Sequence, residues 1–211
     1  MKKSKLINKN LTPLLICLCC FFVAPAQKPA AKKHKPDHIS IAFTTLHTAF
    51  PFGSFSALFT KEFHPGFEIA TGFNWKTKKK HDWFQTFDVG YSYHRFVQHS
   101  FVLYSELGYR YKFLKTFSAA AKLGVGYLHA IPVGKIFELK EDGTYKKKAN
   151  LGRPQAMAGF SLNVSKKISA TGLAVFLEYQ QRLQLPFIKS YVPLLPSNML
   201  MAGIKIPIKS K

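Results

Sequence analysis

Apolar and polar residues alternate along most of the chain with a period of two, which is typical of β-strands. In 83–94 the odd positions, from Trp83 to Tyr93, are mostly aromatic or aliphatic, whereas even positions such as Thr86 and Gly90 are small or polar. Most of these segments are about ten residues long. The pattern predicts eight strands, at 54–63 (a looser fit), 66–76, 83–94, 101–112, 117–129, 155–164, 172–183 and 198–208.

Two architectures bury one face of such strands. A soluble sandwich would hold the apolar faces inside, whereas a transmembrane barrel would turn them toward lipid and keep a polar lumen. Glycines are frequent on the polar faces, aromatic residues gather near strand ends, and about ten residues suffice for a tilted strand to cross a bilayer. These features favour an all-β, eight-stranded antiparallel transmembrane β-barrel. The glycines are Gly66, Gly72, Gly90, Gly108, Gly124, Gly126 and Gly159.

Counting strands back from the C-terminus predicts which connections lie outside the cell. If 198–208 ends in the periplasm, the connections 184–197, 130–154 and 95–100 are extracellular, and 165–171 and 113–116 are periplasmic turns. The longest connections then lie outside, as bacterial barrels prefer. The segment 39–48 also alternates and would be a ninth strand. It is either the true first strand, with 49–63 irregular, or a plug or cap at the periplasmic mouth.

The N-terminus has the features of a secretory signal peptide. Four lysines without acids precede an apolar run that is short for a membrane span, and the sequence Ala24-Pro25-Ala26 fits a cleavage site. Residues 1–26 are therefore predicted to be a cleaved signal, 27–38 a basic flexible lead-in, and 39–211 the barrel domain. The lipoprotein alternative is weak, because the residues before Cys17, Cys19 and Cys20 are not small.

The chain is strongly basic, with 31 Lys and Arg against 10 Asp and Glu and a net charge of +21. Cleavage after Ala26 would remove four basic residues and no acid, which leaves +17 and no cysteine. Export argues against nucleic acid as the partner of this charge, and no nucleic-acid-binding motif is present. The available anions are outer-membrane lipid and lipopolysaccharide phosphates.

Charged residues on the polar faces are candidates for a network inside the lumen. One reading is an ion path or ligand site. The other is a set of mutually paired charges that fills a barrel whose interior is just wide enough for side chains, and buried charges of both signs favour this second reading. The candidates are Glu68, Asp88, His94, Glu106, Arg110, Lys122, Glu178 and Arg182.

Catalysis has little support in the sequence. The histidines are scattered without metal-binding spacing, so neither a metal nor another cofactor is expected. A lipid-modifying hydrolase built on His99, Ser100, Ser105 and Glu106 is disfavoured, because Ser100 and Glu106 would lie about 20 Å apart along one strand. We therefore expect no enzymatic activity.

Two long loops could contact partners. Loop 130–154 has a turn sequence at 141–143, predicts a hairpin, and carries a candidate anion-binding set. Loop 184–197 is apolar, with three prolines and one lysine, so we expect it to fold over the barrel mouth or meet a protein partner. The anion-binding candidates are Lys146, Lys147, Lys148 and Arg153.

Several segments resemble a group of small outer-membrane β-barrel proteins of Bacteroidota-type bacteria. The similar segments are Trp83-Phe84-Gln85-Thr86, Tyr127-Leu128-His129, 150–155 (NLGRPQ) and 186–196 (PFIKSYVPLLP). The resemblance spans most of the mature chain and implies no known activity or catalytic residue. The sequence as a whole predicts an outer-membrane barrel of a Gram-negative bacterium with a structural, binding or assembly-associated role. The alternatives are a narrow pore for small solutes and a lipid-modifying enzyme.

Overall fold

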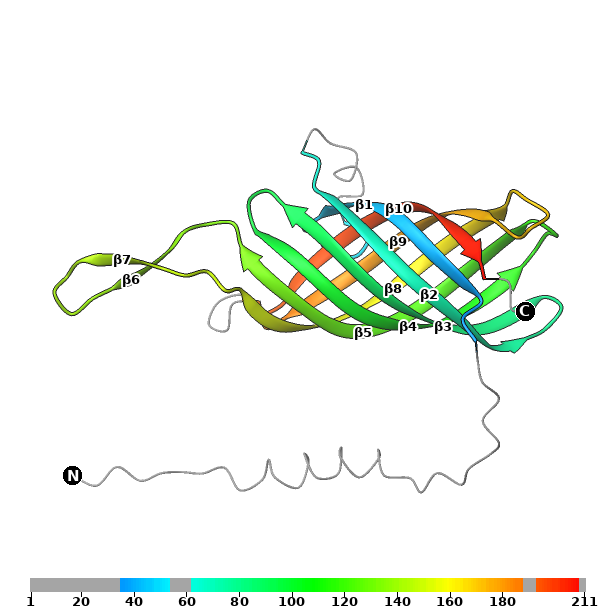
Figure 1. Ribbon diagram of the computed structural model, residues 1–211, viewed down its shortest axis with the longest axis horizontal. Helices are drawn as coiled ribbons and strands as arrows, with labels where there is room; N and C mark the ends of the chain where they lie inside the picture. The colour runs from blue at the N-terminus through cyan, green and yellow to red at the C-terminus, as the bar shows by residue number, and fades with distance from the viewer. Residues whose placement is uncertain (1–34, 54–61, 188–192, 209–211) are drawn as a thin grey trace, which may run out of the picture. The chain divides into compact units, whose positions relative to one another are not determined.

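Eight long strands form one closed antiparallel barrel (Figure 1). The computed structural model describes residues 35–53, 62–187 and 193–208. Around the barrel the strands follow the order β1-β10-β9-β8-β5-β4-β3-β2, and β1 closes the sheet by pairing with both β10 and β2. The barrel strands are β1 (His38–His47), β2 (Pro65–Thr77), β3 (His81–His94), β4 (Gln98–Lys112), β5 (Phe117–Pro132), β8 (Arg153–Lys167), β9 (Ala174–Leu185) and β10 (Leu195–Pro207).

The period-two pattern maps directly onto the two faces of this sheet. In the β3–β4 pair, Val89 opposes Leu103 on the outer face, and Thr86 opposes Glu106 on the inner face. The two outer residues are exposed and the two inner residues are buried. Apolar residues on the outside and polar residues on the inside are the reverse of a soluble sandwich. The predicted fold class is therefore confirmed.

The first strand is the segment 39–48, which the sequence left undecided between a strand and a plug. It forms β1, whose ten residues all pair with β10 on one side and whose residues 38–45 pair with β2 on the other. The loosely fitting prediction of a strand at 54–63 is wrong in its described part, because residues 62–63 lie in no strand; residues 54–61 lie outside the described residues. The pairing of β1 with both neighbours leaves no sheet edge for another strand.

All barrel strands except β1 are longer than the ten residues expected, and β5 reaches sixteen. The extra residues of β4 and β5 lie at the loop end of both strands. Their backbone pairing continues there as far as Gln98 and Pro132. Backbone pairing thus continues past the segments that show alternation most clearly.

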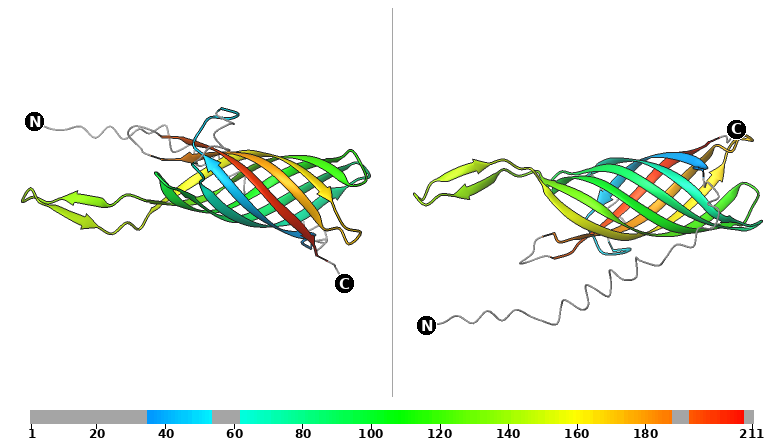
Figure 2. Two further views of the ribbon diagram at one scale, coloured as in Figure 1. Left: turned by 90° about the horizontal axis from the view of Figure 1, so that it is seen from above. Right: turned by 60° about the horizontal axis from the view of Figure 1, so that its bottom comes forward.

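The connections divide the barrel into two ends, which the further views in Figure 2 show. One end, here called the turn end, holds the short turns 78–80, 113–116 and 168–173, the start of β1 and the end of β10. The other, the loop end, holds the longer connections 48–64, 133–152 and 186–194, together with the short turn 95–97. The grouping of short and long connections matches the prediction, and the outward orientation of the loop end stays a prediction.

The outer face carries a broad apolar band between aromatic rows. Leu107, Leu123 and Val125 are exposed in the middle of the barrel. Trp83 and Tyr109 contact each other near the turn end, and Tyr91 and Phe101 do so near the loop end. Such a band with aromatic girdles is what a strand-built membrane protein presents to lipid. No helix among the described residues is long and apolar enough to cross a membrane.

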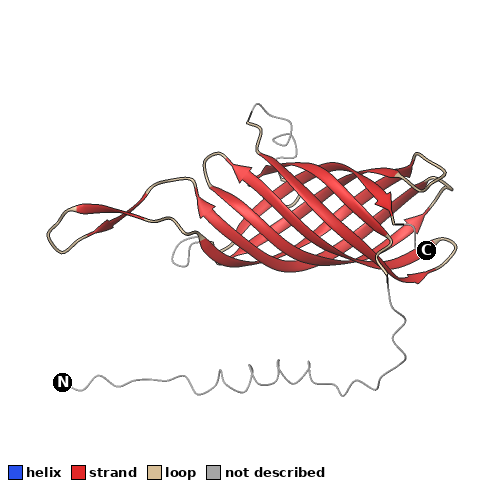
Figure 3. Cartoon of the chain, viewed as in Figure 1, coloured by secondary structure: helices blue, strands red, loops and turns tan. Residues whose placement is uncertain are grey.

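The predicted hairpin in loop 130–154 is present. Strands β6 (Ile136–Leu139) and β7 (Tyr145–Lys148) form a separate two-stranded sheet, drawn as strands in Figure 3. Gly143 adopts φ +78° in its turn, and Asp142 accepts hydrogen bonds from the backbone and hydroxyl of Thr144. A glycine is favoured there because side chains rarely tolerate that conformation.

The segment 49–53 covers polar side chains on the outer face of β9 and β10. Asn198 donates to the carbonyl oxygens of Phe50 (3.1 Å) and Gly53 (2.8 Å), and the backbone N–H of Phe52 donates to Tyr179 (3.0 Å). Phe50 and Phe52 remain exposed. This strap therefore replaces a polar patch on the barrel exterior with phenylalanine side chains.

Candidate functional site

A buried ion-pair network occupies the middle of the barrel lumen. Lys122 on β5 lies between two carboxylates, forming an ion pair with Glu106 on β4 and another with Glu178 on β9 (2.7 Å). Lys122 is 7% exposed and Glu106 only 1%. Removing charges from water is costly, so each is stable here only because its partners are in place.

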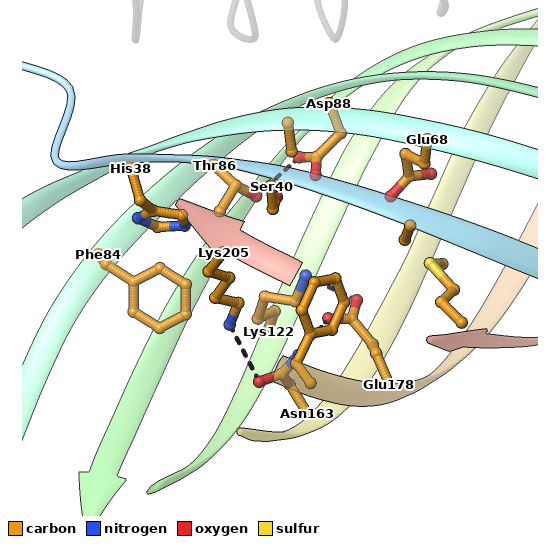
Figure 4. Close-up of a pocket in the computed structure, with 14 residues that line it drawn as sticks. His38, Ser40, Glu68, Phe84, Thr86, Asp88, Lys122, Asn163, Glu178 and Lys205 are labelled. Atoms are coloured by element: carbon orange, nitrogen blue, oxygen red, sulfur yellow. Dashed lines mark hydrogen bonds and ion pairs between the residues drawn. The ribbon is translucent and has the colours of Figure 1, made fainter. Parts of the chain in front are cut away.

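Neutral polar side chains complete the hydrogen bonds of these carboxylates. Glu106 accepts from the hydroxyl of Ser161 (2.5 Å) and the amide of Gln180 (3.1 Å). Glu178 accepts from Asn163 (2.8 Å), whose oxygen in turn accepts from Lys205 (3.2 Å), as Figure 4 shows. The network thus joins β4, β5, β8, β9 and β10 across the lumen.

Arg182 extends the network toward the loop end. Its guanidinium donates to Gln180 (2.6 Å), lies 3.6 Å from the carboxylate of Glu68, and stacks over the ring of Tyr104. Asp88 lies in the same region and accepts from Thr86 (2.7 Å). Figure 4 shows Asp88 and Glu68 on the same side of the cavity.

Glutamines close the lumen nearer the loop end. Gln98 and Gln184 exchange amide hydrogen bonds of 2.8 and 3.2 Å, and Gln184 also donates to Gln155. Gln155 in turn donates to the carbonyl of Pro186 (2.8 Å). All three glutamines are buried. Their amides satisfy one another, so the layer needs no ion or ligand to complete it.

The space that remains inside is small. The cavity beside the ion-pair network and the one beside the glutamine layer each measure about 20 Å³. A volume of this size holds about one water molecule. A side chain at Gly108 would overlap the ring of Phe84, so even the glycines serve to fit neighbouring groups. The middle of the lumen and the glutamine layer are therefore tightly filled.

Three histidines stack at the loop-end mouth. The ring of His64 lies 3.9 Å from that of His94 and 6.4 Å from that of His47. Burial lowers the pKa of His64, the positive charges of His47 and Arg95 lower it further, and Glu62 acts in the opposite direction. The Nδ1 atom of His64 accepts from the backbone of Arg95 (3.3 Å) and must be unprotonated to do so. This contact therefore stabilises the fold at neutral pH, and its contribution is lost as the pH falls below about 6.5, the ordinary histidine value.

The eight predicted lumen residues all come from the inward-facing positions of their strands, but they lie at three levels. Six belong to the central region just described: Glu68, Asp88, Glu106, Lys122, Glu178 and Arg182. Arg110 lies nearer the turn end, 3.6 Å from Asp82, and His94 belongs to the histidine stack.

The predicted set of lumen residues leaves out other charged residues, among them Asp82 and Lys205. Asp82 precedes the predicted start of its strand by one position. It is only 1% exposed and forms ion pairs with both Arg110 and Lys112. The alternation of 198–208 puts Lys205 on the polar face, and extending that of 83–94 by one position puts Asp82 there as well.

The four predicted anion-binding residues do not form one patch in the described structure. Lys146 and Lys147 are exposed and, as neighbours on β7, point to opposite faces of the hairpin. The side chain of Lys148 lies outside the description. Arg153 begins β8, where its guanidinium lies 6.0 Å from the ring of Phe187.

Loop 184–197 is only partly described. The backbone N–H of Phe187 donates to the carbonyl of Pro193 (3.0 Å), so the two sides of the loop meet near its base. Residues 188–192 lie outside the described residues, so the prediction that this loop is ordered and covers the mouth or meets a partner stays a prediction.

The residues considered for hydrolysis are separated by the barrel wall. Ser100 and Glu106 are buried in the lumen, whereas His99 lies on the outer face, where its ring contacts the hydroxyl of Tyr91 (2.8 Å). Ser105 donates to the carbonyl of Thr86. These groups do not form a nucleophile–base relay. No cluster of potential ligands among the described residues could hold a metal ion.

The closed sheet, the apolar exterior and the polar, charge-paired lumen define the class: a small eight-stranded β-barrel of the outer-membrane type.

Comparison with solved structures finds similar barrels. Neisserial surface protein A is 10% identical over 81% of this chain and 95% of its own, with a TM-score of 0.47. Ail of Yersinia pestis, in complex with the heparin analogue sucrose octasulfate, is 11% identical over 82% and 97%, with a TM-score of 0.46. The outer-membrane enzyme PagL is 11% identical over 81% and 99%, with a TM-score of 0.44.

No family model matches the chain, and no curated protein is significantly similar to it. Structural likeness at these identities and TM-scores says nothing about what the chain binds or does.

Proposed function

We propose that this chain is a non-enzymatic, non-conducting outer-membrane anchor that presents the β6–β7 hairpin to phosphorylated glycans at the cell surface, such as those of lipopolysaccharide. Export through a signal peptide cleaved after Ala26 and an origin in a Bacteroidota-type bacterium belong to the same proposal. The filled lumen supports a rigid anchor better than a pore. The separation of His99 from Ser100 and Glu106 argues against the hydrolase alternative.

The hairpin carries the proposal because one of its faces is apolar and uncovered. The register pairs Phe137 with Lys147 and Leu139 with Tyr145, which places these four side chains on one face. Phe137, Leu139 and Tyr145 are 54%, 60% and 71% exposed. A lone two-stranded hairpin is marginally stable in water, so a surface of this kind gains from a partner.

The composition of the hairpin suits a sugar that carries phosphate. Aromatic rings such as Tyr145 can lie against the apolar face of a sugar ring, and lysine is a compact point charge that pairs with phosphate. Lys147 lies on the aromatic face, and Lys140 and Lys146 flank it. The hairpin extends beyond the barrel rim at the loop end, which is the side on which such glycans lie (Figure 1).

A single reporter on the hairpin tests this proposal. The predicted mature chain has no cysteine, so Glu141→Cys, an exposed position in the hairpin turn beside the proposed binding face, accepts one environment-sensitive dye. We expect the dye emission to shift to shorter wavelength when lipopolysaccharide is added to the reconstituted protein, and to shift little with dephosphorylated lipopolysaccharide. Lys146→Glu with Lys147→Glu should suppress the shift, because both positive charges are reversed.

The matched control places the dye at Ala170→Cys, an exposed position in a turn at the opposite end. This dye should not respond to lipopolysaccharide. The absence of a response at position 141, or an equal response to the dephosphorylated form, would refute glycan phosphate as the ligand. A shift produced only by an added protein would assign the hairpin to a protein partner instead.

A further inference from the structure

A larger space inside the barrel wall lies at the turn end and is strongly basic. This vestibule measures about 290 Å³ and is lined by residues of all eight barrel strands, of the turn 113–116 and of the β8–β9 turn. It is more than ten times the size of either cavity deeper in the lumen. Five of its lining residues are cationic and two are acidic: Arg110, Lys112, Lys115, Lys167 and Lys205 against Asp37 and Asp82.

Both carboxylates of the vestibule are already engaged. Asp82 holds Lys112 (2.7 Å) and Arg110 (3.6 Å). Asp37 is hydrogen-bonded to His38 (2.8 Å) and accepts from Asn74. Although burial raises the pKa of Asp37, the hydrogen bond and charge of His38 outweigh it and hold that pKa below its ordinary value. Asp37 thus stays ionised, and its side-chain hydrogen bonds go to His38 and Asn74 and not to a lysine of the vestibule.

Three lysines of the vestibule have no carboxylate partner among the described residues. Lys115 lies in the turn after β4, Lys167 ends β8, and Lys205 enters from β10. The Nζ atom of Lys205 has an amide oxygen, that of Asn163, as its hydrogen-bond acceptor, and it lies over the ring of Phe176 (4.9 Å). Like charges that share a partly enclosed space repel one another, and a bound anion would relieve that repulsion.

The other lining groups can donate hydrogen bonds to oxygen. The hydroxyls of Thr77, Thr116, Ser118 and Ser165 all line the vestibule. Lysine ammonium groups surrounded by hydroxyls suit a tetrahedral oxyanion with several acceptor oxygens and more than one negative charge. Phosphate fits this description better than a single carboxylate does.

We propose that the vestibule binds a small soluble molecule that carries phosphate, entering from the compartment at the turn end. That compartment is the periplasm for a barrel with this loop arrangement. A membrane lipid could supply the same phosphate chemistry, but every strand is hydrogen-bonded to both neighbours, so a lipid headgroup cannot enter through the wall. This site lies at the opposite end from the β6–β7 hairpin and does not depend on the function proposed for it.

Calorimetric titration of the intact barrel with inorganic pyrophosphate tests the site. In an uncharged maltoside detergent and phosphate-free buffer we expect binding of one pyrophosphate per chain, weakening as salt is raised. Lys115→Ala with Lys167→Ala should weaken binding at least about ten-fold, because two charge-assisted contacts are lost. Both positions are exposed, so this variant should fold even if Lys205→Met, the second variant, does not.

The control removes two positive charges from exposed positions at the other end, as Arg95→Ala with Lys135→Ala, and should leave the affinity unchanged. An absence of pyrophosphate binding to the wild-type barrel, or equal weakening in the control, would overturn the site. A repeat in nanodiscs separates the two sources of phosphate. Binding should persist when phosphatidylglycerol is added to phosphatidylcholine, and loss of binding would show that lipid headgroups occupy the vestibule instead.

Discussion

Replacing Lys122 by methionine is expected to destabilise the folded barrel by about 3–5 kcal/mol, because it leaves two buried carboxylates without their cation. Methionine keeps most of the volume of the lysine side chain, so the loss reports charge and not a cavity. Glu106 and Glu178 would then lie across the lumen from each other, with neutral side chains as their remaining hydrogen-bond donors. Equilibrium unfolding in urea, followed by intrinsic fluorescence of the reconstituted protein, measures the change.

A triple variant is the matched control for this effect. Lys122→Met combined with Glu106→Gln and Glu178→Gln removes both signs of charge together, and we expect it to recover most of the lost stability. A single Lys122→Met variant as stable as the wild type would show that the network does not hold the barrel together. So would a triple variant that is no more stable than the single one.

Leu107→Arg should oppose insertion into a bilayer, at a cost of about 2–4 kcal/mol near the midplane. Leu107 points outward from the middle of β4, opposite Gln85 and Leu123, and is 53% exposed in the protein alone. In a membrane that exposed surface would face lipid. The fraction of refolded protein that inserts into liposomes measures the effect.

Two variants give the scale for this result. Leu107→Ala keeps the position apolar and should insert nearly as well as the wild type, and Lys147→Glu, on the exposed hairpin, should not change insertion. If Leu107→Arg inserts like Leu107→Ala, the outer face of β4 does not meet lipid, and the assignment of this barrel to the membrane loses its basis.

The fold could be read from the sequence because one physical pattern repeats in every barrel strand. Alternation assigns each side chain to a face, and the seven segments from 66–76 to 198–208 all become strands of the sheet. The eighth was ambiguous because 39–48 and 54–63 compete for the same place and alternation is a weak signal in a single strand. Only pairing decides between them, since β1 matches both β10 and β2 over nearly its whole length.

The candidate site was predictable as a set of residues but not as a set of contacts. Alternation placed Lys122 and Glu106 inside, yet their pairing depends on the register between β4 and β5, which a two-residue period leaves open. The position of the segment 49–53 against the outer face could not be predicted for a different reason. Gln181 and Asn198 are polar on an outward face, which breaks the pattern, and the strap that satisfies them comes from a distant loop.

The turn-end vestibule also escaped sequence analysis, because its cations come from places that follow no common pattern. Lys115 is in a turn, Lys167 lies at the last position of β8, and Lys205 is one alternating residue among many. Closure of the barrel brings them to one cavity. Counting charged residues gave the positive sign of the net charge, but it could not locate the excess of positive charge in this vestibule.

Membrane fractionation with an unheated gel tests the central claim most directly. The full-length chain is produced in a Gram-negative host, inner and outer membranes are separated, and samples are run with and without heating. We predict recovery in the outer-membrane fraction and a different migration before heating, since a closed barrel of eight paired strands resists unfolding by detergent. Recovery of the mature chain from the periplasm as a soluble protein without detergent, migrating identically before and after heating, would contradict the account.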